Sequence, residues 1–344
     1  MPLEMKRFIL FMGCLGMVVA CNKNLQTEGT PNEEYYTVRF TVGGEIVTSD
    51  SPLTKSMGEN DLLGIIIAEN AEYTSKQYIH AAGLFDNTTN MSVNLKKGTN
   101  YILRCTLVKN GKNTLTPYTS GTYTGYYEPF GRHENGYFTE MTTEVKNYFG
   151  YMQGAPEYYY YYSVGKTISD SRAWGVMKDK VGGADIDRYF TEQTFTATQS
   201  TSINLDLRHT VFGVKYKVTG ITDGTLSLVI DRADPVYSNV RDVFFSESAI
   251  ASDVESEGHI FECNDIYSAW QYPTTYKETA KVSLKWTREI GIEQDLGSVD
   301  IELLRNRMNI ININLGADDG NAGLGIILED TEMGQESVII NVGE

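Results

Sequence analysis

The stretch YYTVRFTV, residues 35–42, decides the fold class of this chain, because its apolar and polar side chains alternate. The apolar members that share one face are Tyr36, Val38, Phe40 and Val42. Successive side chains of a β-strand point to opposite faces, so this pattern predicts a strand with one buried and one solvated face. The same period recurs in MSVNL (91–95), INLDL (203–207), VFGVKYKV (211–218), KVSLKW (281–286) and IININL (310–315).

Other local signals agree with an all-β fold. GIIIAEN, residues 64–70, is a continuous apolar run and predicts a strand that is buried on both faces. Asn110-Gly111 and Asp223-Gly224 supply the positive φ angles of tight hairpins. Amphipathic helical patterns are few, and the best are at 139–148 and 246–255. Short strands joined by hairpins, with one wet face, imply antiparallel β-sandwiches.

The length of 344 residues is more than one hydrophobic core usually serves, which predicts two domains. Strand alternation dissolves between residues 118 and 198, where tyrosine and glycine are frequent, and restarts at Ile203. We therefore expect an N-terminal β-sandwich domain over 35–198, which carries the tyrosine-rich stretch as an insertion. A C-terminal β-sandwich domain is expected over 199–344.

The first residues read as a secretory signal peptide. Lys6 and Arg7 precede 13 apolar residues, 8–20. This run is too short to span a bilayer comfortably and suits the middle of a signal peptide. The sequence therefore predicts a cleaved signal peptide over 1–20.

Val18-Val19-Ala20-Cys21 resembles the lipobox of bacterial lipoproteins, in which the cysteine thiol receives a diacylglycerol and becomes the first residue after cleavage. Two or three acyl chains together hold a protein firmly on a membrane. We therefore expect a lipid on Cys21 and a polar tether over 21–34. The alternative is an ordinary secreted protein in which this cysteine is incidental.

Charge and cysteine content narrow the partners further. The formal net charge is -16, which repels phosphate backbones, and no basic patch offsets it. Nucleic acid is therefore not expected as a partner, nor is an anionic membrane surface beyond the lipid itself.

Cys105 lies in the apolar run YILRCTLV and is expected to be a buried thiol, although a Cys105–Cys263 disulfide stays open in an exported protein.

No catalytic or metal-binding motif emerges. The histidines are scattered, without a pair at ligand spacing: His80, His133, His209 and His259. SVGKT, 163–167, fails as a phosphate-binding loop because Tyr160 stands where the first glycine is required. ADDGNAG, 317–323, lacks the ligand spacing of a calcium loop and reads as an acidic turn. We expect no enzyme activity, no cofactor and no metal.

The run EYYYYYS contains five consecutive tyrosines: Tyr158, Tyr159, Tyr160, Tyr161 and Tyr162. Aromatic faces stack on sugars, so a glycan-binding loop is one interpretation. The other is that alternate tyrosines pack on the core while the rest line a strand edge.

The order of the segments resembles a known family. The lipobox and first strand are followed by PLTKSMGENDLLGIIIAEN (52–70), then by GLFDNTTNMSVNLKKGTNYILRCTLVKNGK (83–112). Next come INLDLRHTVFGVKYKVTGITDGTLSLVI (203–230) and DIELLRNRMNIININL (300–315). This succession resembles the fimbrillin-like lipoproteins of Bacteroidetes, a pilin superfamily with two transthyretin-like antiparallel β-sandwich domains in tandem.

The resemblance implies a non-enzymatic structural or accessory subunit of a fimbrium (pilus) that supports cell adhesion. Such pilins reach the outer membrane as surface-exposed lipoproteins. A trypsin-like protease then removes the N-terminal piece with its first strand, and C-terminal strands of another pilin subunit fill the vacated groove. Stalk, tip and anchor roles stay open, and an outer-membrane lipoprotein that binds glycans through its tyrosine-rich region is the alternative.

Each step has candidate residues in this chain. The cleavage candidates are Lys55, in an expected loop, and Arg39, within the first strand; the family usually cuts after arginine. If no cut occurs, the protein would stay lipid-anchored as a basal or accessory subunit. The donor-strand candidates are the alternating apolar residues of the last segments: Leu324, Ile326, Leu328, Val338, Ile340 and Val342. Alternatively, these segments complete their own C-terminal sheet.

Overall fold

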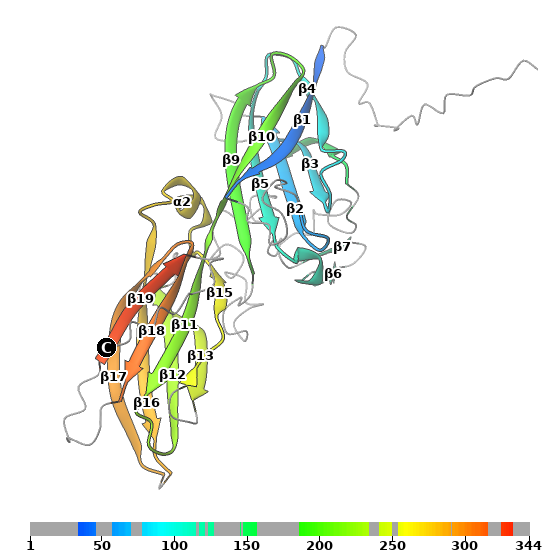
Figure 1. Ribbon diagram of the computed structural model, residues 1–344. Helices are drawn as coiled ribbons and strands as arrows, with labels where there is room; N and C mark the ends of the chain where they lie inside the picture. The colour runs from blue at the N-terminus through cyan, green and yellow to red at the C-terminus, as the bar shows by residue number, and fades with distance from the viewer. Residues whose placement is uncertain are drawn as a thin grey trace, which may run out of the picture. The chain divides into compact units, whose positions relative to one another are not determined.

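The structure, a computed structural model, describes residues 34–45, 57–69, 78–114, 117–120, 123–126, 145, 147–156, 186–233, 241–249, 254–289, 291–315 and 325–332. These residues form two β-sandwiches, one after the other along the chain (Figure 1). The strands up to β10 are β1 (Tyr35–Gly44), β2 (Leu62–Glu69), β3 (Tyr78–Phe85), β4 (Ser92–Lys96), β5 (Asn100–Val108), β6 (Pro117–Ser120), β7 (Tyr123–Tyr126), β8 (Gly150–Pro156), β9 (Arg188–Thr196) and β10 (Thr201–His209). The later strands are β11 (Val211–Thr219), β12 (Thr225–Ala233), β13 (Arg241–Ala249), β14 (Val254–Glu255), β15 (His259–Glu262), β16 (Lys277–Thr287), β17 (Glu293–Leu304), β18 (Arg307–Asn314) and β19 (Gly325–Glu332).

The first sandwich is one sheet in the order β4-β1-β10-β9-β5-β2-β3-β8 that turns a corner between β10 and β9. Only two residue pairs join these strands, Arg208 with Phe190 and His209 with Tyr189. This short contact lets β4, β1 and β10 lie over the other five strands as a second layer. Val38, Val93 and Leu205 come from the smaller layer and are buried against Ile65 and Leu103 of the larger one. We call the buried cluster between these layers the first core.

The second sandwich packs two separate sheets face to face. One has the order β14-β11-β18-β19, with β15 also paired to β11, and the other has the order β13-β12-β16-β17. Phe212, Val214 and Ile311 of the first sheet pack against Leu228 and Leu284 of the second. We call this cluster the second core.

The predicted alternation is confirmed in both cores. Val38 and Phe40 of β1 are buried while Arg39 and Thr41 are exposed. In β2 seven of the eight residues are buried, which confirms the strand that was expected to be buried on both faces. The all-β, two-sandwich class is therefore confirmed, and the transthyretin-like connectivity stays a prediction. Pairing is antiparallel except that β1 runs parallel to β10 and β11 parallel to β18, among the described pairs.

The expected boundary at 199 falls before β10, whereas β10 packs in the first core through Leu205 and Leu207. The second core begins with Phe212 of β11. Alternation restarted at residue 203 because β10 is a strand, but a strand pattern does not tell which core its apolar face joins. The change of core comes between His209 and Val211.

Both expected hairpins are wrong, although each dipeptide contains one residue with a positive φ angle. Asn110 has φ +52° and is followed by a 3-10 turn, η1 (Gly111–Thr114), while β5 pairs with β2 and β9. Gly224 has φ +71°, yet it links β11 and β12, which lie in opposite sheets of the second sandwich. Strands β11 and β12 each bury one face. These buried faces meet across the second core, whereas in a hairpin the two strands would lie side by side in one sheet.

The expected helix at 246–255 is also wrong, because its first part lies in β13, which pairs with β12, and its end lies in β14. Backbone pairing with a neighbouring strand overrides a weak local helical pattern. The other expected helix, 139–148, lies almost wholly outside the described residues. The α-helix found in the described part of the chain is α2 (Ile266–Gln271), whose N-cap Asp265 accepts a hydrogen bond from the Ser268 N–H.

Cys105 lies in the first core and Cys263 in the second, and both are free thiols. The prediction of a buried Cys105 thiol is confirmed, and the alternative of a disulfide between the two is wrong. Burial raises the pKa of both thiols well above the ordinary value. In the described residues no helix is both long and apolar enough to cross a bilayer.

Candidate assembly site at the first strand

Strand β1 fills the middle of the smaller layer of the first sandwich, between β4 and β10 (Figure 1). Its backbone pairs in parallel with β10, where Val38 lies opposite Thr201 and Val42 opposite Leu205. It pairs antiparallel with β4 on its other side. Both backbone edges of β1 are therefore paired with neighbouring strands. A strand that replaced β1 would have to form the same two pairings.

The inner face of β1 carries two large buried side chains. Val38 is 0% exposed and Phe40 is 3% exposed. The Phe40 ring meets the Phe149 ring edge to face, with centroids 5.7 Å apart. Fully burying a side chain of this kind contributes about 1.5–3 kcal/mol, so β1 is a substantial part of the first core.

The outer face of β1 is polar. The Thr37 hydroxyl donates to the Asn94 side chain at 2.9 Å, and the Thr41 hydroxyl lies 3.4 Å from Asn204 Oδ1. Arg39 is exposed on this face, but its backbone is held in the sheet opposite Ser202 and Ser92. A protease would have to separate β1 from its neighbouring strands before its active site could bind the peptide bond after Arg39.

The strand ends at a close approach of two backbones. Gly44 has φ +97°, and a Cβ atom built there would lie 2.1 Å from the Leu207 carbonyl oxygen. No side chain fits at this distance, so the chain needs glycine here. The next residue, Glu45, donates its N–H to the same Leu207 carbonyl at 2.7 Å.

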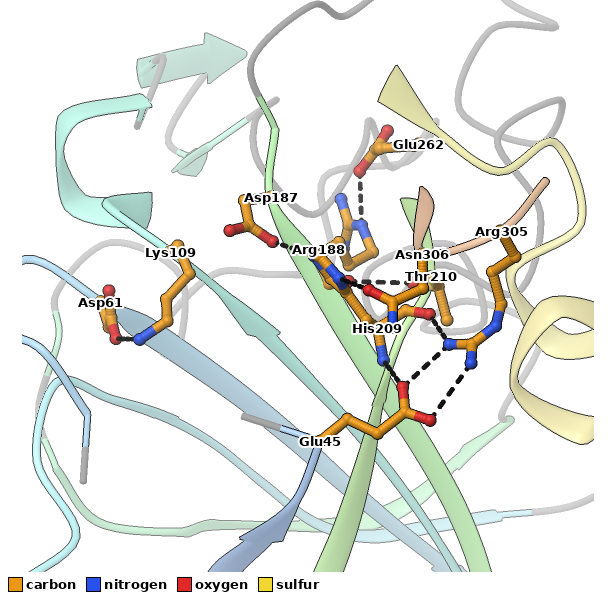
Figure 2. A network of polar contacts seen from close by, with 10 residues as sticks. All are labelled: Glu45, Asp61, Lys109, Asp187, Arg188, His209, Thr210, Glu262, Arg305 and Asn306. Carbon is orange, nitrogen blue, oxygen red and sulfur yellow. Dashed lines mark hydrogen bonds and ion pairs between the residues drawn. The ribbon is translucent and has the colours of Figure 1, made fainter. Parts of the chain in front are cut away.

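Glu45 then joins β1 to the turn between β17 and β18 (Figure 2). Its carboxylate accepts from both terminal nitrogens of Arg305, at 2.9 and 3.1 Å, and from the His209 N–H at 2.9 Å. The Arg305 side chain is only 5% exposed, whereas that of Glu45 is 36% exposed. Burial acts to raise the pKa of Glu45, but the hydrogen bond and charge of Arg305 outweigh it and hold the pKa below its ordinary value.

Arg305 is also tied to two carbonyl oxygens. Its Nε donates to the Pro273 carbonyl at 2.9 Å, and its Nη1 donates to the His209 carbonyl. These oxygens orient the guanidinium toward Glu45, but a carbonyl carries no net charge. The neutralising partner drawn for Arg305 is the Glu45 carboxylate (Figure 2).

His209, the last residue of β10, is held on both ring nitrogens. Its Nδ1 lies 2.5 Å from Asn306 Oδ1 and its Nε2 lies 2.5 Å from Asp187 Oδ1. The Tyr189 ring stacks on the imidazole, with centroids 4.3 Å apart. A histidine buried and fixed in this way acts as a structural connection between strands.

A second pair of ions lies beside this histidine. Arg188 Nε donates to Glu262, and the neighbouring Thr210 N–H donates to the Arg188 carbonyl at 2.9 Å. Arg232, 1% exposed, contacts Glu278 at 3.3 Å. We call the connected group Glu45, Asp187, Arg188, His209, Thr210, Glu262, Arg305 and Asn306 the polar junction.

The polar junction shows no arrangement for catalysis. Within the described ranges, no three His, Cys, Asp or Glu side chains gather as metal ligands do. The His209–Asp187 pair resembles a base and its orienting acid, but Asn306 occupies the other ring nitrogen that would face a nucleophile. The junction instead binds one carboxylate, that of Glu45, through a guanidinium and a backbone N–H.

Sequence reasoning missed the polar junction. Glu45 and Arg305 are 260 residues apart, and neither lies in a motif. A local signal exists only at Asn306, whose φ of +54° fits the tight turn between β17 and β18. The asparagine between two arginines marks that turn, but it does not indicate that Arg305 binds Glu45.

Most of the predicted site residues lie outside the described part of the chain. These are Cys21, Lys55, Tyr158, Tyr159, Tyr160, Tyr161, Tyr162, Leu324, Val338, Ile340 and Val342. The remaining donor candidates, Ile326 and Leu328, lie in β19, which pairs antiparallel with β18 of the same chain. Within this chain, β19 therefore completes its own C-terminal sheet.

Comparison with known proteins gives structural neighbours only. No protein-family model matches the chain, and no curated protein matches it. The fimbrial anchor protein Mfa2 from Porphyromonas gingivalis aligns at 8% identity and a TM-score of 0.38, covering 87% of this chain and 98% of that chain. A candidate adhesin from Bacteroides ovatus aligns at 8% identity and a TM-score of 0.39, covering 88% and 96%. A candidate cell adhesion protein from Bacteroides eggerthii aligns at 9% identity and a TM-score of 0.37, covering 87% and 96%.

By their names these neighbours are a cell adhesion protein, a fimbrial anchor protein and an adhesin.

Proposed function

We propose that the protein is a non-enzymatic structural or accessory subunit of a fimbrium that assembles by donor-strand exchange and supports cell adhesion. In this proposal Cys21 carries a lipid that holds the precursor at the surface of the outer membrane. A trypsin-like protease cuts after Lys55 and releases the N-terminal piece with β1. The C-terminal segment of another subunit then occupies the place of β1.

The observation that carries the proposal is the position of β1. It is the first strand of the described residues, yet it lies between two other strands and supplies buried side chains to the first core. A cut between Glu45 and Met57 would separate it from the rest of the sandwich. Its loss would expose Leu95, Leu205 and their neighbours in the first core, and such an apolar groove is what strand addition fills.

The sequence of the last residues supports the same proposal. VRFTVGGE, residues 38–45, and VIINVGE, residues 338–344, both place three alternating apolar residues before glycine and glutamate. Val338, Ile340 and Val342 would take the places of Val38, Phe40 and Val42. We call residues 338–344 the tail segment.

Limited trypsin treatment of purified full-length precursor tests the proposal. We expect oligomer ladders after cleavage, with a new N-terminus at Ser56. Val338→Asp and Ile340→Asp should abolish the ladders, because each would place a charge in the first core of the neighbour. Asn341→Asp is the matched control, since it adds the same charge on the other face of the tail segment and should keep the ladders.

Cleaved protein that stays monomeric would contradict donor-strand exchange. Ladders that persist with Val338→Asp and Ile340→Asp would show that the tail segment is not the donor. Lys55→Gln should prevent the cut, and unchanged cleavage in that variant would show that the protease uses another site.

A further inference from the structure

The contacts at the end of β1 set a chemical requirement for whatever strand replaces it. Glu45 directly follows β1, so a cut between Glu45 and Met57 removes its carboxylate together with the strand. Arg305 stays behind, because it lies in the turn between β17 and β18. This inference rests on the proposed function and concerns what the donor must carry besides apolar side chains.

Removal of Glu45 would leave a buried cation without its counter-ion. The Arg305 side chain is 5% exposed, and its Nη1 and Nη2 atoms lie 2.9 and 3.1 Å from the two Glu45 oxygens. Its other hydrogen bonds go to the carbonyl oxygens of Pro273 and His209, which do not neutralise a charge. A buried guanidinium that loses its carboxylate is strongly unfavourable, and the bidentate geometry matches the two oxygens of a carboxylate.

A backbone donor completes the binding geometry. The His209 N–H points at Glu45 Oε2 from 2.9 Å, and this N–H is fixed because His209 is held by Asn306 and Asp187. The rigid parts of the site therefore belong to the sandwich that remains, whereas the carboxylate belongs to the strand that leaves.

We propose that Arg305 and the His209 N–H form a carboxylate-binding socket, and that the tail segment of a second copy of this chain must bring the Glu344 carboxylate into it. The ion pair in the socket then strengthens binding only when the donor strand is fully inserted, since the carboxylate lies at the end of that strand. It thereby fixes the register and the direction of the incoming strand.

The direction follows from the pairing of β1. Because β1 runs parallel to β10 and ends beside Arg305, a donor reaches the socket with its C-terminal end only when it also runs parallel to β10. The tail segment has its glutamate at that end. It has one glycine before the glutamate where β1 has two, so with Val342 in the place of Val42 the natural Glu344 falls where β1 has Gly44, one residue short of Glu45. A tail with a second glycine inserted after Gly343 would place glycine beside the Leu207 carbonyl and the glutamate at the socket, and it should therefore bind more tightly than the natural one.

A competition experiment on the full chain tests the socket. A recognition site for a sequence-specific protease is inserted within residues 46–56, and the chain is cut after folding so that the N-terminal piece stays in place. Synthetic peptides of residues 35–45 and 335–344, each with its natural terminal glutamate or with Glu45→Gln or Glu344→Gln, then compete with that piece. The half-displacing concentration is read from a fluorophore on the N-terminal piece.

We expect each glutamine peptide to need a concentration at least about tenfold higher than its glutamate counterpart. Truncating one partner of a fully buried charge pair weakens binding by more than this factor, and Glu45 is partly exposed. In Arg305→Gln protein the two forms should displace equally. Arg288→Gln is the matched control, because Arg288 also binds a carboxylate, that of Asp223, through two nitrogens. That variant should keep the tenfold difference.

Equal displacement by glutamate and glutamine peptides on the unchanged protein would overturn the socket while leaving strand exchange standing. A glutamine penalty that persists in Arg305→Gln protein would also overturn it. If no peptide displaces the N-terminal piece, not even that of residues 35–45, the proposed function fails and the socket fails with it. The comparison of peptides on unchanged protein needs no variant, so a folding defect in Arg305→Gln would not affect it.

Discussion

The guanidinium of Arg305 binds both carboxylate oxygens of Glu45, although 260 residues separate the two in sequence. This contact connects the end of the first strand to the turn before β18. The His209 backbone binds both members of the pair, because its N–H donates to Glu45 and its carbonyl accepts from Arg305. The first strand is therefore held by backbone pairing with β4 and β10, by its apolar face in the first core and by one ion pair at its end.

The Glu45–Arg305 pair should show measurable coupling in the intact chain. Glu45→Gln, Arg305→Gln and the double variant form a cycle in the free energy of unfolding, measured with urea. We expect a coupling of about 1–3 kcal/mol, below the 3–5 kcal/mol cost of breaking a fully buried pair because Glu45 is partly exposed.

The control cycle uses Lys277 and Glu302, whose side chains are 51% and 56% exposed. An exposed pair of this kind should couple by less than about 1 kcal/mol. Equal coupling energies in the two cycles would contradict the special role of the Glu45–Arg305 pair.

The same pair predicts a dependence of stability on acid. Burial tends to raise the pKa of Glu45, while the hydrogen bond and charge of Arg305 lower it by more, so the folded pKa lies below 4.5. A lowered folded pKa means that Glu45 stabilises the fold fully above about pH 4.5, and that this contribution is lost as the pH falls through the folded pKa. The urea midpoint of the natural chain should therefore fall more steeply below pH 4.5 than that of Glu45→Gln. Parallel curves for the two proteins would exclude this linkage.

Local patterns in the sequence were enough to predict the strands that bury one face. In β1 and β11 the alternation of Val38 with Arg39, or of Val214 with Lys215, follows directly from the pleat of a strand. The full burial of β2 was predicted in the same way, from Ile65, Ile66 and Ile67 in succession.

Partners across the sheet could not be predicted in this way. The turn at Gly224 has the positive φ that a hairpin needs, but the apolar faces of β11 and β12 face each other across the second core. A local pattern carries no information on which of two sheets a strand enters. The Glu45–Arg305 pair was missed for the same reason, since neither residue is unusual until the fold brings them together.

Phe40 should be the most costly side chain of β1 to remove. It is 3% exposed and packs on Phe149, so Phe40→Ala leaves a cavity in the first core. We expect a loss of about 3–5 kcal/mol in the free energy of unfolding. Arg39→Ala, on the exposed face of the same strand, should change it by less than about 0.5 kcal/mol. A Phe40→Ala protein as stable as Arg39→Ala would show that β1 is not part of the first core.

The two core cysteines should be inert in the native protein. Cys105 and Cys263 are buried, and burial raises the pKa of both thiols, which leaves little of the reactive thiolate at neutral pH. Iodoacetamide should therefore label neither residue in buffer and both in 6–8 M urea, the range that unfolds most domains, as mass spectrometry of the peptides would show. Rapid native labelling at Cys105 alone would indicate that the first core opens, which is the behaviour expected of a sandwich that has lost β1.

Gly44 should tolerate no side chain. Because Glu45 directly follows Gly44, a substitution at Gly44 should also disturb the ion pair between Glu45 and Arg305. Gly44 and Gly98 have φ values of +97° and +75°, so alanine is strained at both positions. A Cβ atom at Gly44 would lie 2.1 Å from the Leu207 carbonyl oxygen, whereas nothing lies within 4 Å of one at Gly98. Gly98→Ala should therefore cost only the conformational strain, about 1–2 kcal/mol.

Gly44→Ala should cost clearly more, because the chain must move away from Leu207 and carry Glu45 with it. Its unfolding free energy, measured together with that of Gly44→Ala/Glu45→Gln, separates the two effects. If the clash displaces the carboxylate from Arg305, then Glu45→Gln will add little further loss in the Gly44→Ala background. A full and additive loss in the double variant would instead mean that the ion pair survives the displacement of the backbone.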